Sequence, residues 1–102
     1  MRAKKVDGNH SEVVTALRDA GIRVFDTSGV GRGYPDLHCS FRGYSALVEV
    51  KSRTGELNPG QHKFCSEWEG PVIMARSGKE AVEKFFQGYA VGVLTKPLKG
   101  GE

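Results

Sequence analysis

The strongest constraint on the fold comes from two short segments, residues 37–41 and 45–51, which are separated by Arg42 and Gly43. Both segments are rich in apolar, aromatic and β-branched residues, and a glycine-containing dipeptide joins them. Such a pattern is typical of a β-hairpin. We therefore expect two antiparallel strands at this point of the chain.

The register of this hairpin determines which side chains meet. A two-residue turn pairs Phe41 with Tyr44, and the same register places Asp36 opposite Glu49. A four-residue loop keeps both carboxylates on one face, whereas a loop of odd length or a bulge separates them. The sequence thus predicts two converging carboxylates.

The rest of the chain predicts helices and strands around the hairpin. Helical spacing of apolar residues, glycine punctuation and a capping Ser77 indicate, in order, a helix at about 10–20, strands at 22–25, 37–41 and 45–51, a helix at 61–68, a strand at 72–75 and a helix after Ser77. This order, αβββαβα, predicts an α/β or α+β fold with helices flanking a mixed sheet.

The length of 102 residues predicts a single domain. We expect its core at about residues 7–90. The tail at 91–102 has no assigned structure, and an extra strand, a dimer contact and partial disorder are all open for it.

Charge and hydropathy limit the setting in which the chain works. The net charge is only +3, but basic residues gather locally, which is compatible with a face that follows a phosphate backbone. No apolar stretch follows the charged start and no run approaches bilayer length, so we expect an intracellular protein without a membrane segment. Cys39 and Cys65 are expected as small buried residues, and their spacing to His38 and His62 does not predict zinc.

Two charged residues in the second hairpin strand predict chemistry. Glu49 and Lys51 lie two apart and project from one face, while Val48 and Val50 project from the other. Charges in an apolar strand are costly to bury unless they are paired or bind a metal. Paired carboxylates suit Mg²⁺, which acidifies a bound water, and Lys51 can orient that water or stabilise a pentacoordinate phosphorus. This set fits phosphodiester hydrolysis.

At this point the sequence resembles a known family. Gly33-Tyr34-Pro35-Asp36 followed by Glu49-Val50-Lys51 is similar to the PD-(D/E)xK signature, and specifically to the virus-type replication-repair nuclease (VRR-NUC) domain. The similarity extends to three further segments and covers about residues 7–77; these segments are 9–12, 28–31 and 57–61.

The resemblance implies a restriction-endonuclease-like core and a catalytic site. It implies Asp36 and Glu49 as ligands of Mg²⁺, for which Mn²⁺ substitutes, with the Val50 carbonyl as a third ligand. It also implies Glu12 as a helix-borne acid that faces the metal and Gln61 as a polar group near the reacting phosphate.

The resemblance further implies a substrate and a setting. Stand-alone members look like phage-encoded homodimers that cut branched DNA, similar to Holliday-junction resolvases. We therefore expect an Mg²⁺-dependent DNA endonuclease in the cytoplasm of a bacterial host, of phage or bacterial origin. The expected DNA contacts are Ser28, Arg32, Lys4, Lys5 and Arg53.

Plainer interpretations of the same residues stay open. Glu12 fits a capping box with Asn9, Gln61 fits a solvated first helical turn, and Glu49 with Lys51 fits a salt bridge on an edge strand. Phe64 and Trp68 are more typical of a core than of a base-stacking platform.

Alternatives also stay open for the loop and for the whole domain. Gly29, Gly31 and Gly33 precede a strand rather than a helix, so they predict tight turns instead of a phosphate-binding loop. Arg32 among them fits a solvated surface residue equally well. The alternative functions are a non-catalytic nucleic-acid-binding module and a nuclease with another DNA or RNA substrate.

Overall fold

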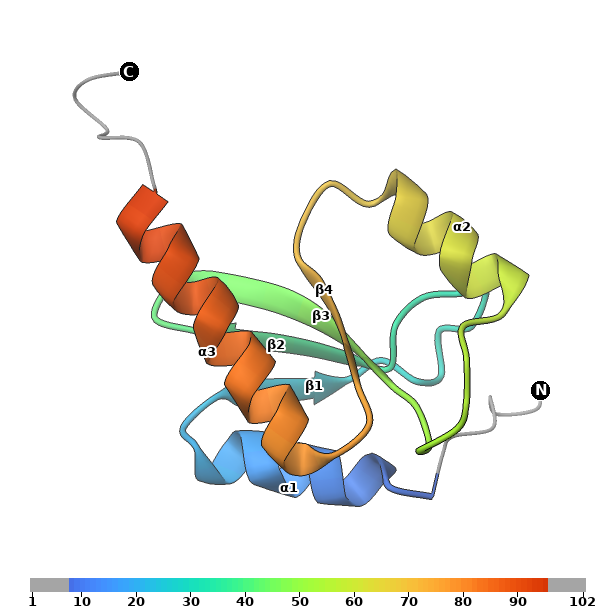
Figure 1. Ribbon diagram of the computed structural model, residues 1–102, viewed down its shortest axis with the longest axis horizontal. Helices are drawn as coiled ribbons and strands as arrows, with labels where there is room; N and C mark the ends of the chain where they lie inside the picture. Colours follow the sequence, from blue (N-terminus) through green and yellow to red (C-terminus); the bar gives the residue numbers. More distant parts are fainter. Residues whose placement is uncertain (1–7, 96–102) are drawn as a thin grey trace.

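The structure, a computed structural model, describes residues 8–95. These residues contain three helices and a four-stranded sheet (Figure 1). In chain order the elements are α1 (His10–Asp19), β1 (Arg23–Asp26), β2 (Leu37–Phe41), β3 (Tyr44–Val50), α2 (Pro59–Glu67), β4 (Val72–Ala75) and α3 (Gly78–Thr95). The predicted order αβββαβα and the α+β class are confirmed.

The sheet is mixed, and its strands lie in the order β1-β2-β3-β4. The first two pairings are antiparallel, and β3 with β4 is parallel. Phe41 pairs with Tyr44, so the turn has two residues as predicted. Arg42 and Gly43 both have positive φ, at 50° and 84°, which is the turn geometry whose twist matches a hairpin.

One face of the sheet carries the hydrophobic core, and α1 and α3 cover it (Figure 1). Val48 and Val50 are fully or almost fully buried there, together with Leu17 of α1 and Phe85 of α3. Burying a side chain of this size stabilises the fold by about 2 kcal/mol. Because side chains alternate along a strand, Glu49 projects from the opposite face, which α1 and α3 do not cover.

Two helix boundaries differ from the prediction. Helix α2 begins at Pro59 rather than at Gln61, because Asn58 caps it and Pro59 suits a first helical position. Helix α3 continues to Thr95, so the extra-strand option is wrong for residues 91–95. Gly88 weakens this helix on propensity alone, but a Cβ there would lie 2.2 Å from the Tyr44 hydroxyl, so packing explains the glycine.

The end of the expected tail, residues 96–102, lies outside the described residues. Within residues 8–95, no helix combines the length and the apolar character needed to cross a membrane.

Candidate active site

Two buried carboxylates occupy neighbouring strands of the sheet. Asp36 immediately precedes β2, and the pairing of Leu37 with Val48 places it opposite Glu49 of β3. Each of the two residues is only 3% exposed. Strand β3 lies between β2 and β4, so the interpretation of Glu49 as an edge-strand residue is wrong.

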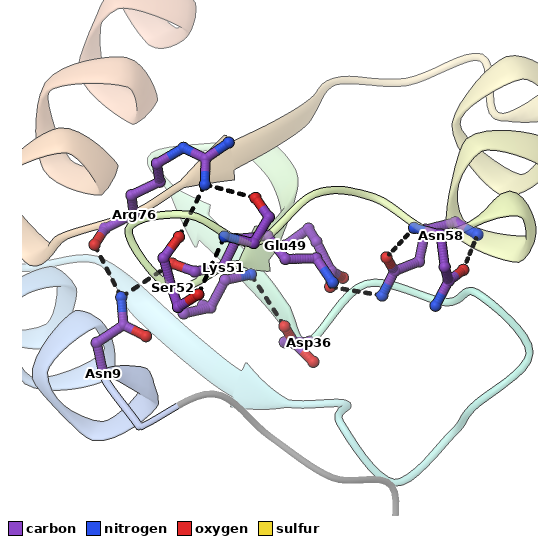
Figure 2. Close-up of polar contacts among 10 residues, drawn as sticks. Asn9, Asp36, Glu49, Lys51, Ser52, Asn58 and Arg76 are labelled. Carbon is purple, nitrogen blue, oxygen red and sulfur yellow. Dashed lines mark hydrogen bonds and ion pairs between the residues drawn. The ribbon is translucent and has the colours of Figure 1, made fainter.

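Backbone contacts on both sides hold Asp36 in place. Its Oδ2 accepts a hydrogen bond from the Val50 N–H at 2.9 Å (Figure 2). Its carbonyl accepts from the Thr27 N–H at 2.7 Å, and the Thr27 hydroxyl donates to the Pro35 carbonyl at 2.8 Å. Since the N–H and C=O of one strand residue point to the same side, the Val50 carbonyl is also directed towards the Asp36 side of β3.

Glu49 lies between a cation and an amide. Its Oε2 is 3.7 Å from Lys51 Nζ and accepts a hydrogen bond from Gln61 Nε2 at 2.8 Å. The Lys51 side chain is 14% exposed, so the pair is shielded from most of the solvent. Close shielded charges interact more strongly than an exposed surface pair does.

Gln61 is part of a capping box at the start of α2. Asn58 Oδ1 accepts from the Gln61 N–H, and Gln61 Oε1 accepts from the Asn58 N–H, both at 2.9 Å (Figure 2). Gln61 is 6% exposed, so the interpretation as a solvated first-turn residue is wrong. The spacing of Asn58 and Gln61 is a sequence signal for this cap, which the predicted helix start at Gln61 did not take into account.

Asn9 and Arg76 fix the backbone around Lys51, and no local sequence signal predicts either role. The Asn9 side chain donates to the carbonyls of Lys51 and Arg76 at 3.1 and 2.8 Å (Figure 2). Arg76 Nη1 donates to the Ser52 and Gly55 carbonyls at 2.7 and 2.6 Å. One guanidinium thereby organises the loop that follows Lys51.

Glu12 lies at a helix terminus. Its Oε2 accepts from the Gly78 N–H at 2.9 Å, and therefore it satisfies one of the free N–H groups at the start of α3. Asn9 makes no side-chain capping hydrogen bond, so the predicted capping box of Asn9 with Glu12 is wrong. The two residues instead join α1 to the ends of β3 and β4 and to α3.

The expected DNA-contacting residues are dispersed. Arg32 and Arg53 are exposed, and Arg32 has a φ of 58° between two glycines that also have positive φ. Ser28 donates from its N–H and its hydroxyl to Asp26 Oδ1, which holds the pKa of Asp26 below its usual value. Lys4 and Lys5 lie outside the described residues.

Phe64 and Trp68 are not part of the core. Trp68 is 43% exposed and stacks on Phe64 at a centroid distance of 5.5 Å, and neither residue belongs to the core cluster. The prediction that they are core residues is wrong, because α2 does not pack under α1 and α3.

The two cysteines differ in burial. Cys39 is fully buried as predicted, and burial raises its pKa to about 12. Cys65 is only half-buried, and its pKa is raised by burial and then by the negative charge of Glu49. Cys65 therefore lies within electrostatic reach of the site.

The donor set suits a hard divalent cation. Asp36 and Glu49 place two buried carboxylates opposite each other, and carboxylate oxygens are ligands that Mg²⁺ prefers. Among residues 8–95, no three His, Cys, Asp or Glu side chains form a cluster that could hold a metal. A cation here would therefore use Asp36, Glu49, the Val50 carbonyl and water, a set typical of Mg²⁺.

Comparison of the chain with known protein families, with curated protein sequences and with solved structures finds no match.

Proposed function

We propose that this protein is an Mg²⁺-dependent nuclease of the PD-(D/E)xK type that hydrolyses phosphodiester bonds in DNA, with branched DNA as the favoured substrate. The observation that carries the proposal is the pair Asp36 and Glu49, each 3% exposed and opposite each other, with Lys51 beside Glu49. Burying two neighbouring carboxylates is costly, and such groups concentrate at functional sites, which favours a catalytic role.

The residues divide the work in this proposal. Asp36, Glu49 and the Val50 carbonyl hold Mg²⁺, with Mn²⁺ as a substitute. When bound, Mg²⁺ would supply an acidified water and neutralise charge on the phosphate. Lys51 offers its ammonium to the attacking water or to a non-bridging oxygen, and Gln61 holds Glu49 in one orientation through the 2.8 Å hydrogen bond.

Asn9 and Arg76 have a supporting role in the proposed mechanism. They fix the carbonyl of Lys51 and the loop after it, so the ammonium starts from a defined backbone position. Groups held by such contacts lose little entropy when the substrate binds.

The test is cleavage of labelled four-way junction, flap, single-stranded and linear duplex DNA, with and without Mg²⁺. Lys51→Ala and Asp36→Asn should each lower the rate at least about 100-fold, which corresponds to one lost electrostatic contact in the transition state. Lys79→Ala is a matched control, because Lys79 is an exposed lysine on α3.

Each outcome of this test has a distinct meaning. Mg²⁺-dependent cutting that both site variants lose supports the proposal, and a preference for the junction supports the branched substrate. Binding of DNA without any cutting by the wild type would instead favour a non-catalytic nucleic-acid-binding module.

The proposed enzyme acts as a symmetric dimer, since two related cuts on a branched substrate match twofold symmetry. Light scattering that gives the mass of one chain at working concentration would contradict this part of the proposal.

A further inference from the structure

Three aromatic rings form a row that begins with Tyr34 before β2 and continues with Phe64 and Trp68 to the end of α2. Tyr34 meets Phe64 edge to face at 5.1 Å, and Phe64 stacks on Trp68 with an interplanar angle of 17°. Tyr34 lies two residues before Asp36, and Phe64 lies three residues after Gln61. The row is therefore attached to the site from two different segments of the chain.

The outer ring is exposed but held in place. Trp68 is 43% exposed, although indoles are usually well covered in a folded domain. A Cβ at Gly70 would lie 2.7 Å from Trp68 Nε1, so the turn after α2 lies directly against the ring edge. An exposed aromatic that neighbouring rings and backbone fix in place loses little entropy on binding a flat partner.

A hollow of about 80 Å³ lies beside Trp68, and His38, Leu47 and Pro71 are among the residues that line it. Leu47 projects from the same face of β3 as Glu49, two residues away. Two strand residues span about 7 Å. Leu47, which lines the hollow, thus lies about two stacked nucleotide steps of ~3.4 Å from Glu49.

From this geometry we infer that Trp68 stacks on an unpaired nucleobase of the substrate, within a few nucleotides of the bond that is cut. The inference rests on the proposed function and deepens it, because it assigns the substrate class: nucleic acid with unpaired bases near the scissile phosphate. Every base has a flat π face, so this subsite selects unpaired bases and not a sequence.

The charge around Trp68 favours a base over a phosphate. Glu69, which follows Trp68, is exposed and disfavours a phosphate, whereas Glu67 is ion-paired with Lys63 one turn earlier on α2. Carboxylates accept hydrogen bonds from the exocyclic amino groups of bases. The exposed Lys63 of α2 is paired with Glu67, and the exposed Arg32 and Arg53 lie in other segments, which favours Trp68 as the contact for a base.

The chain provides its own probe, because Trp68 is the single tryptophan. We would titrate the wild-type protein in EDTA, so that no strand is cut, and follow its tryptophan fluorescence. The titrants are a single-stranded 12-nucleotide DNA, the same strand with abasic nucleotides at its centre, and a blunt duplex. We expect quenching by the first strand, and binding about tenfold weaker to the abasic strand, which keeps the phosphates but lacks the bases.

Variants separate stacking from general affinity. Trp68→Ala should weaken binding of the labelled single strand about tenfold in fluorescence anisotropy, and Trp68→Phe should restore most of the loss. Val93→Ala is the matched control, because Val93 is another exposed apolar residue, near the end of α3, and its substitution should leave the affinity as it is. Circular dichroism melting verifies that each variant folds.

The outcomes distinguish this inference from the proposed function. Equal affinity for the normal and abasic strands, or no change in Trp68 fluorescence, would overturn the inference even if Asp36-dependent cleavage is found. Conversely, base-dependent quenching in a protein that cuts no DNA in Mg²⁺ would overturn the nuclease and keep Trp68 as the base contact of a binding module.

Discussion

Gln61 donates from its side-chain Nε2 to Glu49 Oε2 at 2.8 Å, while its Oε1 accepts from the Asn58 N–H at 2.9 Å. A backbone N–H only donates, so the amide oxygen must face Asn58 and the amide nitrogen must face Glu49. The cap that starts α2 therefore also orients one carboxylate of the candidate site. Helix α2 and the site form one hydrogen-bonded unit.

Replacing this amide by a carboxylate tests the contact. Gln61→Glu keeps an acceptor for the Asn58 N–H but places a second negative charge against the buried Glu49. We expect a loss of about 2 kcal/mol in the free energy of unfolding at pH 8 in EDTA, since the charges are alike and poorly solvated. Denaturant unfolding measures this free energy, and added Mg²⁺ should recover part of the loss.

The control for Gln61→Glu is Asn58→Ser, which keeps a capping side chain and adds no charge. It should cost only a few tenths of a kcal/mol in the free energy of unfolding. A Gln61→Glu variant as stable as the wild type in EDTA would show that the two side chains do not approach each other in solution.

The loop before β2 offers a matched pair of glycines. Gly31 and Gly33 both have positive φ, at 77° and 82°, but only Gly33 lies against another segment, where a Cβ would come within 2.3 Å of the Gly60 carbonyl. Gly31→Ala should cost about 1 kcal/mol of stability from backbone strain alone. Gly33→Ala should cost about 3 kcal/mol, because it also pushes the start of α2 away.

Thermal or denaturant unfolding of the two alanine variants measures this difference in stability. Equal losses for both would contradict the close packing of Gly33 on Gly60. If α2 is displaced, Gly33→Ala should also reduce cleavage more than Gly31→Ala does, because Gln61 lies next to Gly60.

The elements that the sequence predicted correctly are those with a local sequence signal. The hairpin register followed from one dipeptide, Arg42-Gly43, and it correctly placed Asp36 opposite Glu49. The end of α3 was not predicted, because Gly88 and Gly92 contradict helix propensity, and the close approach that explains Gly88 comes from the distant Tyr44. Contacts between remote segments have no local sequence signal.

The same difference between local signals and contacts of remote segments applies to the candidate site. Two-residue spacing was enough to bring the side chains of Glu49 and Lys51 together, although β3 ends at Val50 and the predicted strand ran one residue further, to Lys51. Asn9 and Arg76 reach Lys51 and its loop from 42 and 24 residues away along the chain. The local cap expected for Glu12 is wrong, because its carboxylate accepts from the Gly78 N–H, a contact that the packing of α1 on α3 determines. Its role at the metal stays a prediction.

The reactivity of the Cys65 thiol depends on the charge of Glu49. Burial and then the Glu49 carboxylate raise the pKa of the Cys65 thiol, so at pH 8 less thiolate is present than for a free cysteine. We expect slow alkylation by iodoacetamide, with a rate that rises with pH above the usual thiol range. Glu49→Gln removes the charge, lowers the pKa and should accelerate alkylation at pH 8.

Mass spectrometry follows this reaction at one thiol, because Cys39 is fully buried with a pKa of about 12 and should stay unmodified in the folded protein. Glu83→Gln is the control, since Glu83 is an exposed carboxylate on α3 and should not change the rate. An unchanged rate in Glu49→Gln would mean that Glu49 carries no negative charge near Cys65.

Asp36→Asn separates the structural and the metal-binding roles of this residue. An asparagine oxygen still accepts from the Val50 N–H, so the 2.9 Å contact and the fold should persist. The variant also removes one of two buried negative charges, so without metal it should be as stable as the wild type or about 1 kcal/mol more stable. The wild type should gain about 1.4 kcal/mol when Mg²⁺ is at ten times its dissociation constant, and Asp36→Asn should gain almost nothing.

Denaturant unfolding with and without Mg²⁺ measures both effects on one sample. Asp19→Asn is the control, because it neutralises an exposed acid at the end of α1 and should keep the full gain from Mg²⁺. Equal stabilisation of Asp36→Asn and wild type would place the cation elsewhere. A large loss of stability without metal would instead mean that Asp36 is needed as an anion to fold, independently of any bound cation.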